Sequence, residues 1–259
     1  MKTDVSIPMP DSSENGGDAR AFVFTPDPNS EAGGDGPWPA AILYMDAPAI
    51  RPAMFEMGER LAQAGYYVLL PDVFWRAGPY PPLDIVKARA GDPEMGALFA
   101  KLRASTNANL QMQDTGVYLT WLESQPKAKA RKVGVTGYCM GGRIAVVAAG
   151  LFPDRIAAAG SFHPGGLVTD GPDSPHLLAP KIKARVHVGG ADEDAHFTRE
   201  HCDALAKAFK DAGVKGEVEI YDGAKHGYTM PDMQVYNEPA AERHWREMFD
   251  LFDSTLKQA

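Results

Sequence analysis

Short apolar runs alternate with amphipathic segments along most of this chain. The runs have the length of strands and contain few polar residues, which is typical of strands in a sheet covered on both faces. Six strands are predicted in this way, over residues 40–45, 66–71, 132–137, 156–162, 184–190 and 217–222. Before them, apolar residues in 4–8 and 19–26 flank the polar segment 12–18, a pattern that predicts a hairpin.

Amphipathic segments between these runs indicate helices. Four helices are predicted, over residues 52–65, 107–125, 197–213 and 239–257. The second is expected to bury Leu110, Val117 and Trp121, which share one face. The last keeps a helical spacing of apolar residues at Ala241, Trp245, Met248, Phe252 and Leu256. Residues 76–93 are rich in Pro and Gly and are predicted to be irregular.

The alternation of strands and helices predicts an α/β protein with a mostly parallel central sheet and helices on both faces. Residues 1–259 are expected to form a single domain, since no linker divides the chain convincingly. Ligands of such sheets bind beyond the carboxyl ends of the strands. Functional residues are therefore expected directly after strands.

The stretch "GYCMG" places Cys139 between two glycines, at the point where a predicted strand passes into a helix. This is the arrangement of a nucleophile elbow, in which the central residue is held in a strained conformation and nearby side chains must be absent. The N-terminus of the following helix favours a thiolate. The alternative is a small buried cysteine that packs in a Gly-rich turn.

Two further residues complete a chemical pattern. Asp192 follows the strand at 184–190, and His226 follows the strand at 217–222. The order nucleophile, acid, histidine is that of a hydrolase triad. We expect His226 to accept the thiol proton and later return one to the leaving group, and Asp192 to orient its imidazole.

The motifs "GYCMGG", "GGADED" and "AKHGY", with the weaker "YMDAPAI" and "LLPDVFWR", resemble those of the dienelactone hydrolase family, over about residues 19 to 255. The resemblance implies an α/β-hydrolase fold and a Cys-His-Asp triad. The implied reaction is hydrolysis of a small ester or lactone through a thioester, without a cofactor.

The resemblance also implies roles for residues after the strand at 40–45. Asp46 matches a family carboxylate, usually Glu, that contacts the resting thiol. Ala47 and Met140 match the positions whose backbone N–H groups form the oxyanion hole. Asp46 as a cap of the nearby turn or helix is the alternative.

The substrate pocket is implied in the same way. Arg76 matches one of two family arginines that hold a substrate carboxylate, whereas Met230 stands where the second is expected. A more apolar pocket is therefore predicted, lined by Trp75, Tyr80, Tyr228 and Met230. His163 follows a strand at the same edge and is a further candidate for the pocket. Arg76 as a solvated surface residue and His163 as a locally hydrogen-bonded loop residue are the alternatives.

Composition excludes several other classes. A net charge of -8 argues against a broad nucleic-acid surface, and no segment has the length and apolarity of a signal peptide or a membrane span. Cys139 and Cys202 are too few for a disulfide framework. A cytoplasmic protein, monomeric or a small homo-oligomer, is expected.

Neither a metal nor a nucleotide is predicted. The acidic segment 192–196 has alternating ligand types, but Asp192 is already assigned to the triad. No Walker lysine follows the glycines around Cys139. Two other functions remain open, namely a catalytically silent protein that binds a small molecule and a sensor in which the thiol is oxidised.

Overall fold

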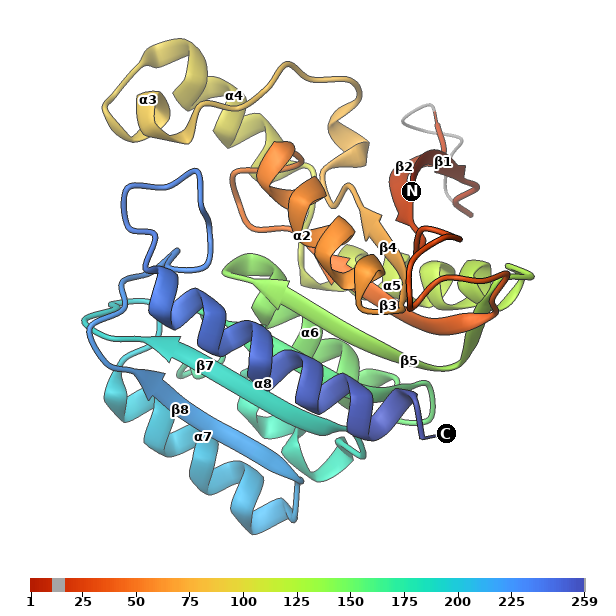
Figure 1. Cartoon of the computed structure of the whole chain (residues 1–259). Helices are drawn as coiled ribbons and strands as arrows, with labels where there is room; N and C mark the ends of the chain where they lie inside the picture. Colours follow the sequence, from red (N-terminus) through yellow and green to blue (C-terminus); the bar gives the residue numbers. More distant parts are fainter. Residues whose placement is uncertain (11–16, 259) are drawn as a thin grey trace.

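The computed structural model describes residues 1–10 and 17–258, and its centre is a twisted eight-stranded sheet (Figure 1). The strands are β1 Lys2–Ile7, β2 Ala19–Phe24, β3 Trp38–Tyr44, β4 Tyr67–Pro71, β5 Ala128–Tyr138, β6 Ile156–Phe162, β7 Arg185–Ala191 and β8 Gly216–Tyr221. Their order in the sheet is β1-β2-β4-β3-β5-β6-β7-β8. All six strands predicted from apolar runs are present, with bounds that shift by up to four residues.

The sheet is mostly parallel, as predicted. β1 and β2 pair with each other in antiparallel fashion, and β2 is antiparallel to β4, whereas the pairs from β4 to β8 are parallel. The hairpin prediction is thus confirmed for its two strands. Residues 11–16 of the predicted turn lie outside the described residues.

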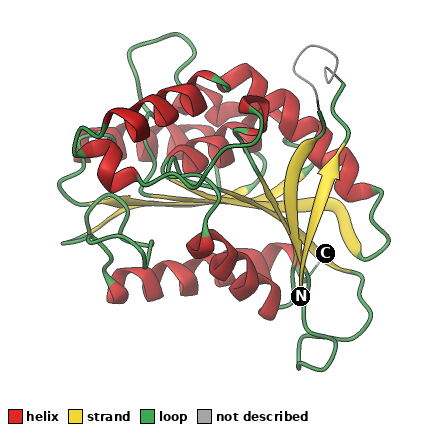
Figure 2. Ribbon diagram, turned by 90° about the horizontal axis from the view of Figure 1, so that it is seen from above, coloured by secondary structure: helices red, strands yellow, loops and turns green. Residues whose placement is uncertain are grey.

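Helices cover both faces of the sheet (Figure 2). α2 Pro52–Gln63 and α8 Glu238–Leu256 lie on one face, and α5 Ala108–Glu123, α6 Met140–Leu151 and α7 Arg199–Ala212 on the other (Figure 1). The five apolar residues predicted for the last helix are all buried in α8. Within the described chain, no helix combines the length and apolarity needed to cross a bilayer.

The segment predicted to be irregular is partly helical. It contains the short 3-10 helix η1 Trp75–Ala77 and the helix α3 Ile85–Arg89, and α4 Pro93–Ala104 follows; a second 3-10 helix, η2, spans Pro175–Lys181. Asp84 and Asp92 cap α3 and α4, because their carboxylates accept hydrogen bonds from backbone N–H groups of the first turn. The prediction holds for residues 78–84 and is wrong for residues 85–89, which form a helix that Gly91 follows.

The buried face of α5 also differs from the prediction. Val117 and Trp121 are only half-buried, while Asp114 and Thr115 are buried. Each polar residue has a partner in the interior, since Asp114 binds Arg76 and Thr115 binds the Tyr44 hydroxyl at 2.7 Å. The buried face of α5 thus combines the apolar residues Met112, Tyr118, Leu119 and Leu122 with polar residues that have hydrogen-bond partners.

The carboxyl ends of the neighbouring parallel strands β3 and β5 lie at a topological switch point of the sheet. β3 lies between β4 and β5, and the helices that follow β3 and β5, α2 and α6, cover opposite faces of the sheet. Such a reversal is where open α/β sheets bind ligands. Asp46 follows β3 and Cys139 follows β5 at this point.

Candidate active site

The strand-to-helix bend holds Cys139 in a strained conformation, with φ 53° and ψ -113°. A Cβ atom on Gly137 would lie 2.2 Å from the Gly141 carbonyl oxygen, and one on Gly141 would lie 2.4 Å from the Tyr44 carbonyl oxygen. Only glycine fits these two positions. The geometry predicted for the elbow is confirmed, and it leaves the thiol half-buried at the start of α6.

His226, in the loop after β8, contacts both a carboxylate and the thiol. Its Nδ1 lies 2.6 Å from Oδ2 of Asp194, and its imidazole also makes a hydrogen bond with Cys139. Asp194 is almost fully buried, and its other oxygen accepts the backbone N–H of His196 at 2.8 Å. A carboxylate in this position fixes one imidazole tautomer, with the proton on Nδ1.

These contacts favour the protonated imidazole. Burial alone would lower the pKa of His226, but the hydrogen bonds and negative charges of Asp194 and Cys139 outweigh it and raise the pKa to about 10. The imidazole of His226 is therefore held in its charged form beside the sulfur of Cys139.

The acid that contacts the histidine is Asp194 and not Asp192, so the predicted assignment is wrong. Asp192 instead accepts hydrogen bonds from Arg199 at 2.8 Å and from the backbone N–H of Gly223 at 3.0 Å. β7 ends at Ala191, directly before Asp192, and the chain turns at Glu193, which has φ 50°. Because the acidic run "DED" offers three carboxylates, only this turn selects the third.

Asp46 is buried at the end of β3, but its partner is a guanidinium. Both carboxylate oxygens accept hydrogen bonds from Arg51, at 2.5 and 3.0 Å. Burial raises the pKa of Asp46, while the charge of Arg51 opposes the rise. Among the described residues no hydrogen bond joins Asp46 to the Cys139 thiol, so the contact implied for the resting thiol is replaced by this ion pair.

Ala47 and Met140 lie on adjacent turns. Ala47 belongs to the turn directly after β3, and Met140 is the first residue of α6, so its N–H has no acceptor within the helix. Gly141 packs against the carbonyl oxygens of Tyr44 and Met45, which brings the start of α6 against the end of β3.

The residues predicted to line a substrate pocket are mostly engaged elsewhere. Arg76 makes two hydrogen bonds of 2.7 Å to Asp114, which also accepts the Trp75 indole N–H. Tyr80 donates to Asp72 at 2.8 Å. Tyr228 and Met230 are fully buried and cannot line an open pocket. The apolar pocket predicted from these positions is therefore not formed by them.

His163 lies behind His226 and is also buried, which corrects its prediction as a pocket residue. Its Nε2 is 2.7 Å from the Thr229 hydroxyl, and its ring centroid is 5.1 Å from that of His226 in an edge-to-face arrangement. Burial and the nearby His226 lower the pKa of His163 well below its usual value. A neutral ring thus packs against the imidazole of His226.

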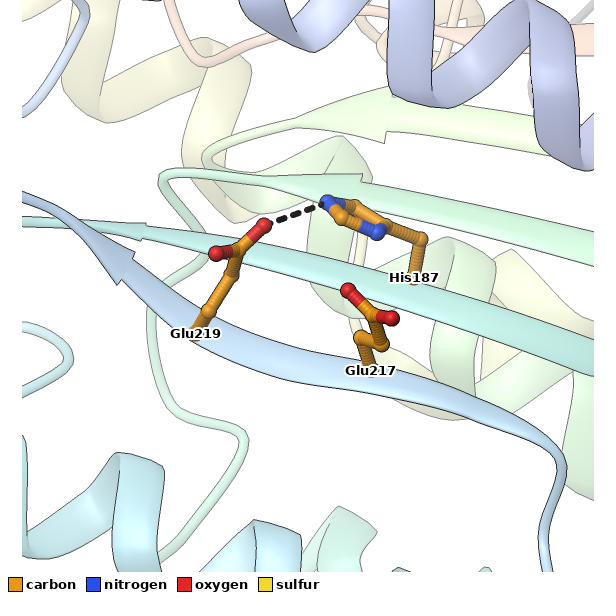
Figure 3. A group of neighbouring side chains, drawn as sticks. All are labelled: His187, Glu217 and Glu219. Carbon is orange, nitrogen blue, oxygen red and sulfur yellow. Dashed lines mark ion pairs between the residues drawn. The ribbon is translucent and has the colours of Figure 1, made fainter.

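A group of possible metal ligands lies away from this site, on β7 and β8. His187, Glu217 and Glu219 bring their ligand atoms within 4.8 Å of one another (Figure 3). Arg243 of α8 already donates to Glu219 at 2.5 Å. Burial and the charges of Arg243 and Arg185 lower the pKa of His187 to about 4. The positive charges present here offset the attraction of the group for a metal ion.

Comparisons with known proteins identify the family of this chain. Residues 20–256 match the model of the dienelactone hydrolase family. The carboxymethylenebutenolidase of Rhodococcus opacus is 25% identical over 223 residues, which cover 83% of this chain and 81% of that protein.

Solved structures show the same fold. A Klebsiella pneumoniae protein provisionally named a dienelactone hydrolase has a TM-score of 0.80 at 23% identity, covering 97% of this chain and 98% of its own. The dienelactone hydrolase of Anabaena variabilis has a TM-score of 0.65 at 17% identity, covering 99% of this chain and 98% of its own. The predicted α/β-hydrolase fold is thereby confirmed.

Proposed function

Since this chain belongs to the dienelactone hydrolase family, we propose that it cleaves an ester or lactone bond with the Cys139 thiolate as nucleophile. The observation that carries the proposal is the position of His226, which binds the Asp194 carboxylate and the Cys139 thiol at once. A protein that only bound a small molecule would not need this set of contacts.

In the acylation step, the thiolate attacks the carbonyl carbon of the substrate. A carbon–sulfur bond forms, and the carbonyl oxygen takes the negative charge beside the backbone N–H groups of Ala47 and Met140. The carbon–oxygen bond then breaks, and the imidazolium of His226 gives its Nε2 proton to the leaving alkoxide. A lactone substrate keeps its new hydroxyl attached to the acyl group.

In the second step, neutral His226 removes a proton from water, and the resulting hydroxide attacks the thioester. The carbon–sulfur bond breaks, the carboxylic acid leaves, and the thiolate and imidazolium are restored. Asp194 keeps the Nδ1 proton in place through both steps and stabilises the charged ring.

The leaving group limits the substrate class. A thiolate departs from a tetrahedral intermediate more readily than an ordinary alkoxide, so the first step succeeds best when the departing oxygen is stabilised. Enol esters, strained lactones and aryl esters meet this condition. The buried Met230 and the Arg76–Asp114 pair support substrates that carry no second carboxylate.

The test is to trap the acyl-enzyme. With p-nitrophenyl acetate we expect an acetyl adduct on Cys139 in the intact protein, observed by mass spectrometry after an acid quench. Cys139→Ala and His226→Ala should lose more than about 10³-fold in kcat, as members of one catalytic unit do.

The other cysteine supplies a matched control. Cys202 is buried in α7, so Cys202→Ala should keep both the adduct and the turnover. Equal rates in Cys139→Ala and the intact protein would refute the proposal. An oxidised Cys139 thiol with no turnover of any ester would favour a redox sensor instead.

A further inference from the structure

The guanidinium of Arg51 links two segments at the active-site edge of the sheet, namely the turn after β3 and the loop after His226. Arg51 donates to both oxygens of Asp46 and, through Nε and Nη2, to both oxygens of Asp232 at 2.6 and 3.2 Å. The Arg51 side chain is only 12% exposed, and that of Asp46 only 2%. Paired forks of this kind fix orientation as well as distance.

On one side, Arg51 holds the turn that follows β3. Ala49 in this turn has φ 69°, a left-handed conformation that is strained for a residue other than glycine. The Ala49 N–H donates to the Asp46 carbonyl at 3.2 Å, and the Ala49 carbonyl accepts from Arg51 at 3.3 Å. Arg51 thus contacts the turn at both ends, with Ala47 between them.

On the other side, Arg51 holds the loop that follows His226. Asp232 lies in this loop, whose ends are joined by a hydrogen bond from the Asn237 N–H to the Tyr228 carbonyl at 3.1 Å. Burial lowers the pKa of His163, and the charge of Arg51 adds to that effect, so the guanidinium lies within electrostatic reach of the ring behind His226.

We propose that Arg51 is a positioning residue that aims the Ala47 N–H at the carbonyl oxygen of the substrate. The role rests on the proposed function, because it presupposes acyl transfer at Cys139. His226 has its own anchor in Asp194, 2.6 Å away, so the thiolate and imidazolium do not depend on Arg51. The oxyanion hole does depend on Arg51, because the side chain of Arg51 anchors the strained turn that contains Ala47.

The experiment separates two reactions of the same thiol. Hydrolysis of p-nitrophenyl acetate creates an oxyanion, whereas alkylation of Cys139 by iodoacetamide is a displacement at carbon that creates none. We expect Arg51→Gln to lower kcat about 10- to 100-fold with a smaller change in KM, the effect of a misplaced oxyanion donor. The alkylation rate and its pH profile should stay within about twofold of the intact protein.

Arg60, in the helix α2 that begins directly after Arg51, supplies a matched control. It forms a bidentate pair with Glu242 of α8, at 2.6 Å for both hydrogen bonds, and lies outside the site. Arg60→Gln should leave kcat within about twofold. An equal fall of kcat in Arg51→Gln and Arg60→Gln, both measured below their melting temperatures, would overturn the proposal, as would alkylation that falls in step with hydrolysis.

Two milder variants cover the case in which Arg51→Gln does not fold. Asp232→Asn keeps the buried pair with Asp46 and weakens only the exposed half of the bridge, so kcat should fall about 3- to 10-fold. Arg51→Lys keeps the charge but lacks the planar fork, so kcat should fall by less than about 10-fold relative to the intact protein. Unchanged kcat in both variants would contradict the role of Arg51.

The proposed function can be refuted independently of the role of Arg51. If Cys139→Ala retained full hydrolysis, the thiol would not be the nucleophile, whatever the Arg51 variants did. If Cys139→Ala were inactive and the Arg51 variants fully active, acyl transfer would stand and only the positioning role would be lost.

Discussion

Two aspartates are buried at the same edge of the sheet, in the turns on either side of Cys139. Asp194, after β7, binds the imidazole of His226, and Asp46, after β3, binds the guanidinium of Arg51. Both carboxylates are at most 2% exposed, and each makes a contact of 2.5 or 2.6 Å. The two are alike in burial and differ in the partner, which binds both oxygens of Asp46 but one oxygen of Asp194.

The difference decides what each pair can do. An imidazole gains and loses a proton in the accessible pH range, so the Asp194–His226 pair can take part in proton transfer. A guanidinium stays charged, so the Asp46–Arg51 pair can only hold structure in place. A buried carboxylate near a nucleophile is therefore not by itself a sign of acid–base chemistry.

Removal of the carboxylate from the proton-transfer pair is expected to have the largest effect. Asp194→Asn should lower kcat about 10³- to 10⁴-fold, because an amide does not fix the imidazole tautomer or stabilise the imidazolium. Steady-state hydrolysis of p-nitrophenyl acetate measures this. Asp192→Asn is the matched control in the same loop and should stay within about twofold. A larger loss of kcat in Asp192→Asn than in Asp194→Asn would show that Asp192 is the carboxylate that orients His226.

Removal of the carboxylate from the structural pair should act mainly on stability. Asp46→Asn leaves the buried Arg51 with only its exposed partner Asp232, and we expect a loss of about 3 kcal/mol in the free energy of unfolding by urea. The double variant Asp46→Asn with Arg51→Gln should recover part of this loss, since no uncompensated charge is left. Full additivity of the two single changes would show that the pair is not coupled.

The charge state of His226 can be measured directly. Its contacts with Asp194 and Cys139 favour the protonated ring, so its NMR titration midpoint should lie well above 6.5, near the expected pKa of about 10. The stability that these contacts give is therefore present below pH 6.5 and is lost as the pH rises through about 10. Cys139→Ala removes one hydrogen bond and one negative charge and should lower the midpoint. A midpoint near 6.5 in the intact protein would mean that these contacts do not favour the charged ring.

The smallest effect is expected from a carboxylate on the substrate. Asp114 already balances the charge of Arg76. An ion pair between Arg76 and a substrate carboxylate should therefore be as weak as a surface pair and change kcat/KM by at most about fivefold. The comparison is between p-nitrophenyl butyrate and mono-p-nitrophenyl succinate, with the intact protein and Arg76→Gln. A preference of more than a hundredfold for the succinate, lost in Arg76→Gln, would show that Arg76 binds substrate.

The mostly parallel character of the sheet could be predicted from the sequence, whereas the order of its strands was not predicted. Its central strands are continuous apolar runs, and the elbow at Cys139 needs glycine at Gly137 and Gly141 for local steric reasons. His226 could be found because it is the histidine that directly follows the last strand. These features depend on residues near one another in the chain, and local patterns record them.

The partners of the charged residues could not be predicted. "DED" presents three carboxylates, and only the turn at Glu193 determines that Asp194 meets the imidazole. Asp46 and Arg51 are close in sequence, but Asp232, which completes their network, is 181 residues beyond Arg51. Ion pairs depend on distances of a few ångströms between side chains from different elements, and a sequence fixes those distances only through the packing of the whole sheet. Local patterns in the sequence thus determined the fold class and the elbow at Cys139, whereas tertiary packing determined which carboxylate binds the imidazole and which binds the guanidinium.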